Sequence, residues 1–135
     1  MAKTFRLEIL TLKSTTYAGM VISVIAPGAK GRFGVLVRHA PMISSLETGI
    51  LKIREPAGKE ASAFVGEGFL MVEKDNVVIL ASRAEMAHEI DVERAIASRD
   101  RALTRLKEKP AGLDIARAEA SLHRALARLK VAGPS

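Results

Sequence analysis

The sequence predicts an α+β protein in which an N-terminal antiparallel β-sandwich is followed by a C-terminal antiparallel two-helix hairpin. Two patterns predict this fold. Over residues 5–80, short runs alternate apolar and polar side chains, as strands with one buried face do. From about residue 90, apolar residues recur at the spacing of amphipathic helices. Because no flexible linker separates the halves, we expect two closely packed domains, residues 1–87 and residues 88–135.

The first half begins with a clear strand, in which Phe5, Leu7 and Ile9 alternate with more polar neighbours. A similar alternation runs through residues 21–26. Further apolar runs of strand length are residues 51–54, 61–65, 69–72 and 77–80, and a polar turn at residues 74–76 joins the last two. Many short strands at this spacing favour an antiparallel sandwich over a parallel α/β sheet.

Two glycine turns and a His-Ala-Pro corner lie between residues 26 and 41. Residues 28–34 superficially resemble a phosphate-binding loop, but they lack the P-loop order of residues, and no helix follows them. We therefore predict turns here, with a special backbone angle at Gly34, so that Gly34→Val is expected to disrupt assembly. His39 has no neighbouring nucleophile or carboxylate pair, and we predict that its ring hydrogen-bonds to orient the corner.

The second half predicts two capped helices. Asp91 is the expected N-cap of the first, with Ile90 before it as a hydrophobic staple. Proline and glycine within residues 108–112 end this helix. Asp114 caps the second helix, which Gly133 and Pro134 end. The two apolar seams consist of Val92, Ala95, Ile96, Ala102, Leu103 and Leu106, and of Ile115, Ala118, Leu122, Ala125, Leu126 and Leu129.

Each of these helices has only one narrow apolar stripe, which is rich in alanine. Such a hairpin buries little surface by itself. It is therefore a candidate moving part that exchanges one packing partner for another at modest cost.

Composition narrows the classes of function. The formal net charge is +6, but the 21 basic residues are interleaved with 15 acidic ones, and aromatic residues are 4% of the chain. This pattern argues against a nucleic-acid partner, since it offers neither a basic block nor a stacking platform. The absence of cysteine excludes disulfides and thiol chemistry. We expect a soluble polypeptide without metal, which meets a membrane only through a complex.

Arginines form a stripe on each predicted helix, spaced by seven and four residues. These arginines are Arg94, Arg101 and Arg105 on the first helix, and Arg117, Arg124 and Arg128 on the second. Folded together, the stripes converge on a polyphosphate, because guanidinium groups bind phosphate oxygens in pairs. The alternative, which the spacing alone favours, is two solvated faces balanced by nearby carboxylates.

A β-domain with these turns, followed by a hairpin that opens with Ile90-Asp91-Val92-Glu93-Arg94-Ala95, resembles the epsilon subunit of F-type ATP synthases over nearly the whole chain. The resemblance implies a non-catalytic subunit of the central stalk that couples proton or sodium flow to rotation. Its sandwich would contact the gamma subunit and the ring of c subunits. The residues implied at this interface are Gly31, Arg32, Phe33, Gly34, His39 and Pro41.

The resemblance also implies two positions of the hairpin. It would fold against the sandwich, or extend along gamma toward the alpha and beta subunits and resist ATP hydrolysis. The complex would lie at the cytoplasmic face of a bacterial inner membrane, with an organellar equivalent left open. The implied partners include no nucleic acid.

In ATP-binding members of this family, the hairpin carries an Ile/Leu-Asp-x-x-Arg-Ala motif with a glutamate before it and arginines after it. The resemblance thus implies a regulatory ATP as the only ligand, without hydrolysis at its site. Arginines would meet phosphates or brace the helices, acidic residues would hold adenine or order the loop, and apolar residues would line the base pocket. The matching positions are Glu85, Ile90, Asp91, Arg94, Ala95, Arg101, Arg124 and Arg128.

Other interpretations stay open at this point. Residues 113–118 repeat the Leu/Ile-Asp-x-x-Arg-Ala pattern, which helix capping alone explains. The chain could also be an interaction module of an unrelated complex, a small-molecule enzyme or a nucleic-acid binder. Binding to gamma, to a small substrate or to DNA distinguishes these alternatives.

Overall fold

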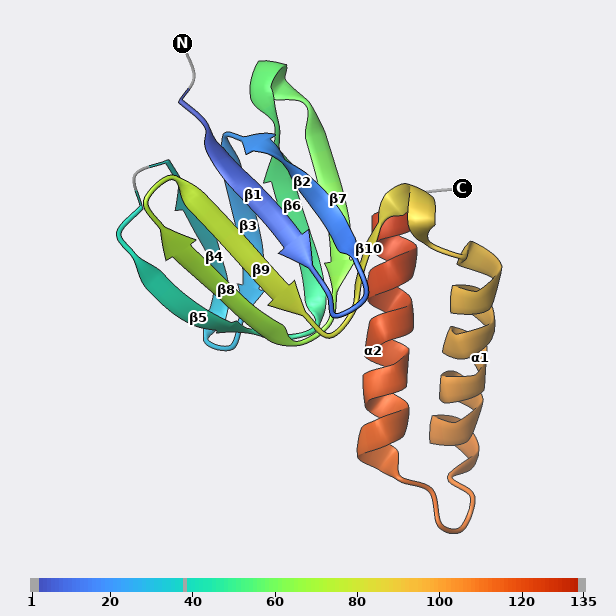
Figure 1. The fold of residues 1–135 in the computed structure, drawn as a ribbon. Coiled ribbons are helices and arrows are strands. Elements are labelled where there is room, and N and C mark those ends of the chain that lie inside the picture. The colour runs from blue at the N-terminus through green and yellow to red at the C-terminus, as the bar shows by residue number, and fades with distance from the viewer. Residues whose placement is uncertain (1–2, 38, 134–135) are drawn as a thin grey trace.

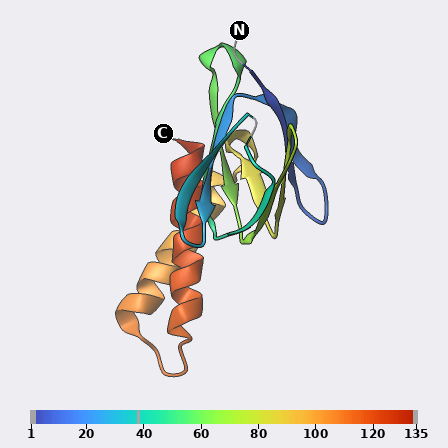
Figure 2. The same cartoon turned by 90° about the vertical axis from the view of Figure 1, so that its left-hand side faces the viewer.

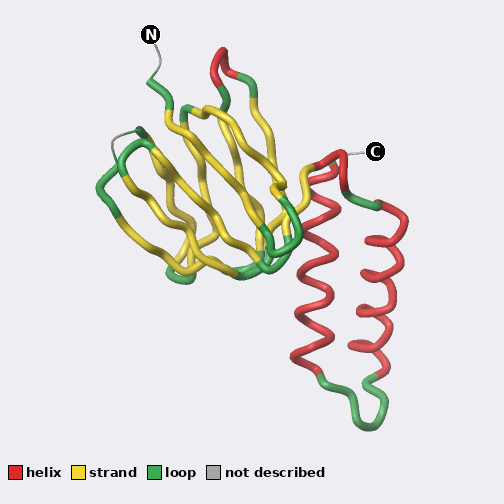
Figure 3. Tube along the Cα trace, viewed as in Figure 1, coloured by secondary structure: helices red, strands yellow, loops and turns green. Residues whose placement is uncertain are grey.

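The computed structural model describes residues 3–37 and 39–133, which form a β-sandwich followed by a helical hairpin (Figure 1). Figure 3 shows how strands give way to helices along the chain. The strands are β1 Phe5–Leu10, β2 Thr15–Val21, β3 Ser23–Gly28, β4 Gly31–Leu36, β5 Met42–Leu46, β6 Gly49–Arg54, β7 Glu60–Val65, β8 Gly68–Glu73, β9 Asn76–Ala81 and β10 Ala84–Met86. The helices are the short η1 Pro56–Gly58 and η2 Ala87–Glu89, followed by α1 Val92–Glu108 and α2 Ile115–Ala132.

The strands form two layers that face each other across the core. One layer contains β10, β7, β6 and β3, with β4 paired to β3, and the other contains β5, β8, β9, β1 and β2. A single bridge from Gly28 to Leu46 joins the layers at one edge. At the other edge, Thr16 Oγ1 donates a hydrogen bond to the carbonyl of Ala84 at 3.4 Å. The sandwich is therefore tied together at both edges.

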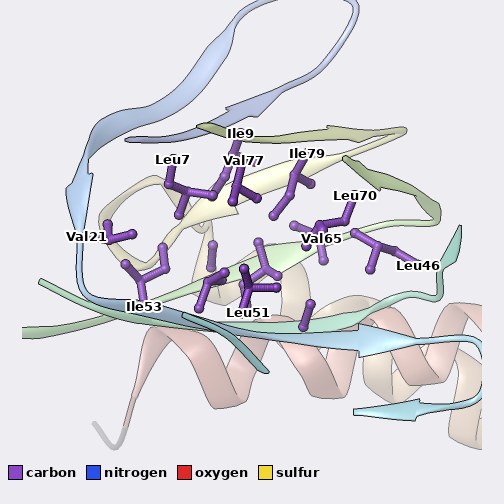
Figure 4. Packing of buried hydrophobic residues seen from close by; sticks show 14 of the residues in the cluster. Leu7, Ile9, Val21, Leu46, Leu51, Ile53, Val65, Leu70, Val77 and Ile79 are labelled. Atoms are coloured by element: carbon purple, nitrogen blue, oxygen red, sulfur yellow. The ribbon is translucent and has the colours of Figure 1, made fainter. Parts of the chain in front are cut away.

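An aliphatic core fills the space between the layers (Figure 4). Leu7, Ile9 and Ile79 point inward from one layer, while Leu51 and Ile53 point inward from the other, and all five are almost completely buried. Alternation along each strand places these side chains on one face, as the sequence predicts. Burial of so much aliphatic surface provides the main stabilisation of the sandwich.

One pairing departs from the predicted antiparallel pattern. β1 pairs antiparallel with β2 but parallel with β9, with Leu7 opposite Val77 and Ile9 opposite Ile79. The two strands belong to opposite ends of the sandwich domain, so their pairing depends on how the whole sheet closes. No turn between neighbouring strands specifies it.

The turn predicted for residues 28–34 is much shorter than expected. Ala29 and Lys30 alone form it, because Gly28 pairs with Gly31 and the following residues belong to β4. Gly31 has a φ of +116°, which glycine adopts without strain. The prediction of a special backbone angle at Gly34 is wrong, since its φ is not positive and it pairs with Ile25 inside the ladder.

Substitution of Gly28 and of Gly34 is expected to show that the turn needs glycine at the first position and not at the second. A Cβ at Gly28 would lie 2.7 Å from the Gly31 carbonyl oxygen, whereas the nearest atom to a Cβ at Gly34 is 4.0 Å away. Gly28→Ala should therefore lower the free energy of unfolding by about 1–3 kcal/mol. Gly34→Ala should change it by less than about 0.5 kcal/mol. Urea unfolding of both variants measures the two values, and equal losses would contradict the assignment of the turn.

Both long helices begin with the predicted aspartate caps. Asp91 Oδ1 accepts a hydrogen bond from the Arg94 amide at 3.1 Å, and Asp114 Oδ1 accepts one from the Arg117 amide at 3.0 Å. α1 ends at Glu108, after which Lys109 turns the chain in a left-handed conformation. α2 ends at Ala132, and Gly133 follows with a φ of +88°. Pro134, the other predicted terminator, lies outside the described residues.

A seam of small side chains joins the two helices. Ala95 and Ala102 of α1 and Ala118 and Ala125 of α2 are buried, as predicted for these positions. Five larger residues predicted on the same seams are 38–49% exposed, so the alanines form the contact and these side chains do not: Val92, Ile96, Leu103, Ile115 and Leu126. Small side chains let the helix backbones approach closely. α1 packs chiefly on α2, while α2 also packs on β6, β7 and η2. Figures 1 and 2 show α2 between the sandwich and α1, with the connecting turn extending well below the sandwich.

Candidate functional site

The hairpin docks on the sandwich through a small apolar patch. Phe64 is fully buried on the outer face of β7, between residues whose side chains enter the sandwich core. Ile90 before α1 and Ala127 and Val131 of α2 pack against it, together with the partly buried Ile50. This patch, which we call the docking patch, holds the C-terminal half of α2 to the sandwich.

Polar contacts fix the hairpin at a second place. His123 Nε2 donates to the carbonyl of Thr48 at 2.9 Å, and this bond joins α2 to the loop before β6. The Thr48 hydroxyl donates to Glu67 at 3.3 Å. Hydrogen bonding to its own backbone amide is the main cause that lowers the pKa of Glu67, with smaller contributions from Thr48 and Ser82. The sandwich rim facing α2 is therefore an ordered polar surface.

A cavity of about 360 Å³ opens where the hairpin meets the sandwich. Three parts of the chain form its walls: the segment around β10, the first turns of α1 and the middle of α2. The lining residues are Arg83, Glu85, Asp91, Arg94, Ala95, Ser98, Ser121, Arg124 and Arg128. We call this the hairpin cavity. It exists only while the hairpin is docked, because its walls come from both domains.

Arg128 is held in place by two contacts with the sandwich. Its Nε donates to Glu85 Oε1 at 2.5 Å, and its guanidinium carbon lies 4.4 Å from the centre of the Phe64 ring. The ion pair neutralises one positive charge of the cavity. Cation–π contacts and partly buried ion pairs restrict an arginine to one orientation. Arg128 therefore links the hairpin cavity to the docking patch.

Three other arginines of the cavity have no carboxylate partner in the described part of the chain. They are Arg83, Arg94 and Arg124. Partial burial, together with the positive charges of Arg83 and Arg128, lowers the pKa of Arg124. Like charges held close together destabilise each other, and an anion relieves this repulsion. Guanidinium groups arranged in this way are suited to bind a phosphate chain.

Six of the eight predicted nucleotide residues line the hairpin cavity. Ile90 does not, because it is buried in the docking patch. Arg101 also lies outside, and its guanidinium donates to the Ser98 hydroxyl, which does line the cavity. The capping role of Asp91 accounts for part of the motif, as the repeat at Asp114 suggests.

Sequence reasoning missed Arg83. This residue follows β9 and enters the cavity only because α2 docks beside it. Its position two residues before Glu85 is the only signal in the sequence, and that spacing places both side chains on one side of an extended segment. Ser98 and Ser121 were also missed, and they add hydroxyl donors to the cavity walls.

The residues predicted at an interface with gamma and the c-ring belong to β4 and to the segment before β5. In Figure 1, β4 and β5 lie at the left of the sandwich and the hairpin lies at its right. Arg32 and Gly34 are exposed on β4, and Phe33 packs against the core. His39 Nδ1 donates to the carbonyl of Ala40 at 2.8 Å, in the corner that leads through Pro41 to β5.

An apolar surface on the other layer was not predicted. Ile43 of β5, Phe69 of β8 and Leu80 of β9 are 73%, 53% and 43% exposed. Phe69 lies directly opposite Leu80, and Ile43 lies opposite Met71 in the same sheet. We call these residues the outer sheet patch. Exposed apolar surface of this kind, gathered on one face, is typical of a protein interface.

The described residues include no group of three His, Asp or Glu side chains placed to hold a metal ion. Within the same part of the chain, neither helix is long and apolar enough to span a membrane.

Comparison with known proteins places this arrangement in a family. Residues 4–87 match the family model of the ATP synthase delta/epsilon chain β-sandwich domain, and residues 88–133 match that of its long α-helix domain. The ATP synthase epsilon chain of Moorella thermoacetica is 48% identical over 107 residues, which are 79% of this chain and 80% of the relative. The chain belongs to the ATP synthase epsilon-chain family. The epsilon chain of Desulforamulus reducens is 42% identical over 109 residues, covering 81% of this chain and 82% of the relative.

Solved structures agree with the epsilon-chain fold. A chain from the mitochondrial ATP synthase of Euglena gracilis, in a structure of OSCP, F1 and the c-ring, has a TM-score of 0.79. It is 22% identical, and the alignment covers 96% of this chain and 81% of that chain. A chain from the Tetrahymena thermophila central stalk and c-ring structure has a TM-score of 0.53 at 13% identity, covering 93% and 91%. At these identities the likeness concerns the fold.

Proposed function

We propose that this epsilon chain is a non-catalytic central-stalk subunit whose hairpin senses ATP and controls hydrolysis by the complex. The observation that carries the proposal is the hairpin cavity, where Arg83, Arg94 and Arg124, none of them in an ion pair with another described residue, face one space. A ligand there contacts Arg83 of the sandwich and Arg94 and Arg124 of the hairpin together. Binding therefore stabilises the docked hairpin.

The sandwich supplies the permanent attachment. The outer sheet patch offers an apolar surface for the gamma subunit, while β4, at the edge of the sandwich opposite the hairpin in Figure 1, offers a surface for the c-ring. If gamma and the c-ring bind these faces, the docking patch stays available to the hairpin. The complex would lie at the cytoplasmic face of a bacterial inner membrane, and membrane contact would occur only through it.

The chemistry of the cavity fits ATP as a bound regulator. Arg94 and Arg124 are placed to meet the phosphate oxygens, and Ala95 provides a small apolar surface for the base. The two carboxylates of the cavity are already engaged, Glu85 by Arg128 and Asp91 by the Arg94 amide. The cavity thus supplies positive charge and hydrogen-bond donors, and its proposed role is binding without hydrolysis.

The binding free energy of the ligand determines how far the hairpin shifts toward the docked state. A ligand that binds only the docked state favours it by RT ln(1 + [L]/Kd), which is about 2.7 kcal/mol at one hundred times Kd. When ATP is scarce the hairpin would leave the sandwich and expose its arginine face. That face would then meet acidic surfaces of the alpha and beta subunits and resist rotation in the hydrolysis direction.

A titration and an activity assay test the proposal together. Calorimetry of the full chain with ATP should show saturable one-to-one binding, and Arg94→Gln should weaken it roughly tenfold. Arg99→Gln is the matched control, because Arg99 pairs with Asp100 and does not line the cavity. In a complex reconstituted with alpha, beta and gamma, Arg94→Gln should inhibit hydrolysis at ATP concentrations where the wild-type chain does not. Absence of ATP binding at millimolar concentration would overturn the sensing role.

A further inference from the structure

A second arginine-lined cavity lies next to the hairpin cavity, farther along the hairpin toward its turn. Its volume is about 510 Å³. It is formed by the last half of α1, the turn and the first half of α2, with no residue from the sandwich. The lining residues are Ala102, Arg105, Gly112, Leu113, Asp114, Arg117, Ala118, Ser121 and Arg124. We call it the turn cavity. It shares Ser121 and Arg124 with the hairpin cavity.

The turn cavity carries a strong excess of positive charge. Arg105, Arg117 and Arg124 line it, and no ion pair within the described ranges engages any of the three. Its single carboxylate, Asp114, accepts a hydrogen bond from the Arg117 amide at 3.0 Å. The N-terminus of α2, an 18-residue helix, opens at the same place and adds its positive dipole end.

The two cavities are separated by helix geometry. Arg94 and Arg105 are eleven residues apart on α1, which corresponds to about 16 Å along the helix axis. Arg117 and Arg124 are about 10 Å apart on α2 by the same rise per residue. The arginine stripes therefore form two clusters, and only Arg124 belongs to both.

We propose that the turn cavity is a separate binding subsite for a small phosphate anion, inorganic phosphate or pyrophosphate. Arg105 and Arg117 hold the anion from opposite helices, and Arg124 binds it from the side nearest the hairpin cavity. Paired guanidinium groups and the start of a long helix are the donors that recognise phosphate oxygens. The subsite uses hairpin residues alone and does not depend on the proposed ATP-sensing function.

The shared arginine couples the two subsites. An anion in the turn cavity engages Arg124 and brings negative charge close to the hairpin cavity. Both effects weaken the binding of a polyphosphate in the adjacent hairpin cavity. Pyrophosphate is thus expected to raise the apparent Kd for ATP, and ATP to raise that for pyrophosphate by the same factor.

Calorimetric titration of the full chain with pyrophosphate, in a chloride buffer at physiological salt, tests the subsite. Wild type should bind saturably, and Arg105→Gln and Arg117→Gln should each weaken binding roughly tenfold. Arg105 and Arg117 are exposed, so both variants should fold, which circular dichroism checks. Arg99→Gln is the control and should leave pyrophosphate affinity within about twofold, since Arg99 pairs with Asp100 and does not line the turn cavity.

Two results would overturn the subsite: no saturable pyrophosphate binding at millimolar concentration, or a loss that follows Arg94→Gln and spares Arg105→Gln. The second result would place the anion in the hairpin cavity. Failure of ATP binding with pyrophosphate binding intact would refute only the proposed sensing function. Titration with inorganic phosphate shows which anion is preferred, and in either case the Arg105 and Arg117 variants must weaken its binding.

Discussion

Replacement of Phe64 by alanine is expected to release the hairpin from the sandwich while the sandwich stays folded. Phe64 is the centre of the docking patch, where Ile90, Ala127 and Val131 surround its ring and Arg128 lies over one face. Removal of a fully buried phenylalanine side chain costs about 3–5 kcal/mol. The side chain belongs to the docking patch and not to the sandwich core, so this loss falls on the contact with α2.

Hydrogen exchange of the full chain measures this effect. Amides of α1 and α2 should lose protection in Phe64→Ala, while those of β1, β8 and β9 keep it. Phe69→Ala is the matched control, since Phe69 is 53% exposed on the opposite layer and makes no part of the docking patch. Unchanged protection of α2 in Phe64→Ala would show that other contacts hold the hairpin. A parallel loss of ATP affinity is expected, because the hairpin cavity needs both domains.

Arg124→Gln is expected to weaken ATP binding by roughly 10–100-fold. The substitution removes one charge-assisted hydrogen bond to phosphate and one of the positive charges that attract it. Burial, together with the positive charges of the neighbouring Arg83 and Arg128, lowers the pKa of Arg124. Arg124 therefore lies where the positive charges of the cavity are close together. The same repulsion disfavours the docked state without a ligand. Solvent screens part of this repulsion, and Glu67 offsets another part, so we expect Arg124→Gln to raise the free energy of unfolding of the unliganded chain only slightly.

A variant that loses ATP affinity but gains stability shows that Arg124 has a binding role and not a structural one. Calorimetry with ATP and thermal unfolding without it measure the two quantities on the same protein. Arg124→Lys should keep part of the affinity, because lysine retains the charge but not the paired donors of a guanidinium group. If Arg124→Gln lowered both affinity and stability, Arg124 would be a structural residue, and the field argument would fail.

The sequence predicted most of the fold because its signals are local. Alternation in β1 and the caps at Asp91 and Asp114 each depend on a few neighbouring residues, and each prediction was confirmed. Four strands, β2, β4, β5 and β10, were not predicted. β4 was missed because its two glycines resembled a turn, although only Gly31 has a positive φ. The parallel pairing of β1 with β9 depends on contacts between residues about seventy positions apart, which no local pattern encodes.

In the candidate site, too, local sequence patterns predicted some residues, and only the docked fold reveals the others. Residues on helix faces, such as Arg94 and Arg128, could be placed by spacing and by resemblance to the family. Arg83 and the assignment of Ile90 to the docking patch depend on how the hairpin rests on the sandwich. The docked geometry also divides the six arginines of the two stripes: Arg94 and Arg128 line the hairpin cavity, Arg105 and Arg117 the turn cavity, Arg124 both and Arg101 neither. This division could not be read from their regular spacing.

The alanine seam has a mechanical consequence. The chain joins the N-terminal end of α1 to the sandwich through η2 and Ile90, while the rest of α1 packs chiefly on α2, and α2 packs on the sandwich. A pull on the far end of α1 is therefore passed to α2 through the alanine seam and from α2 to the docking patch. Short side chains interlock less than long ones, so the seam resists sliding weakly. In a rotating machine, torque applied to α1 would act on the same equilibrium between docked and released hairpin that the proposed ATP binding would shift. The hairpin would then respond to load as well as to concentration.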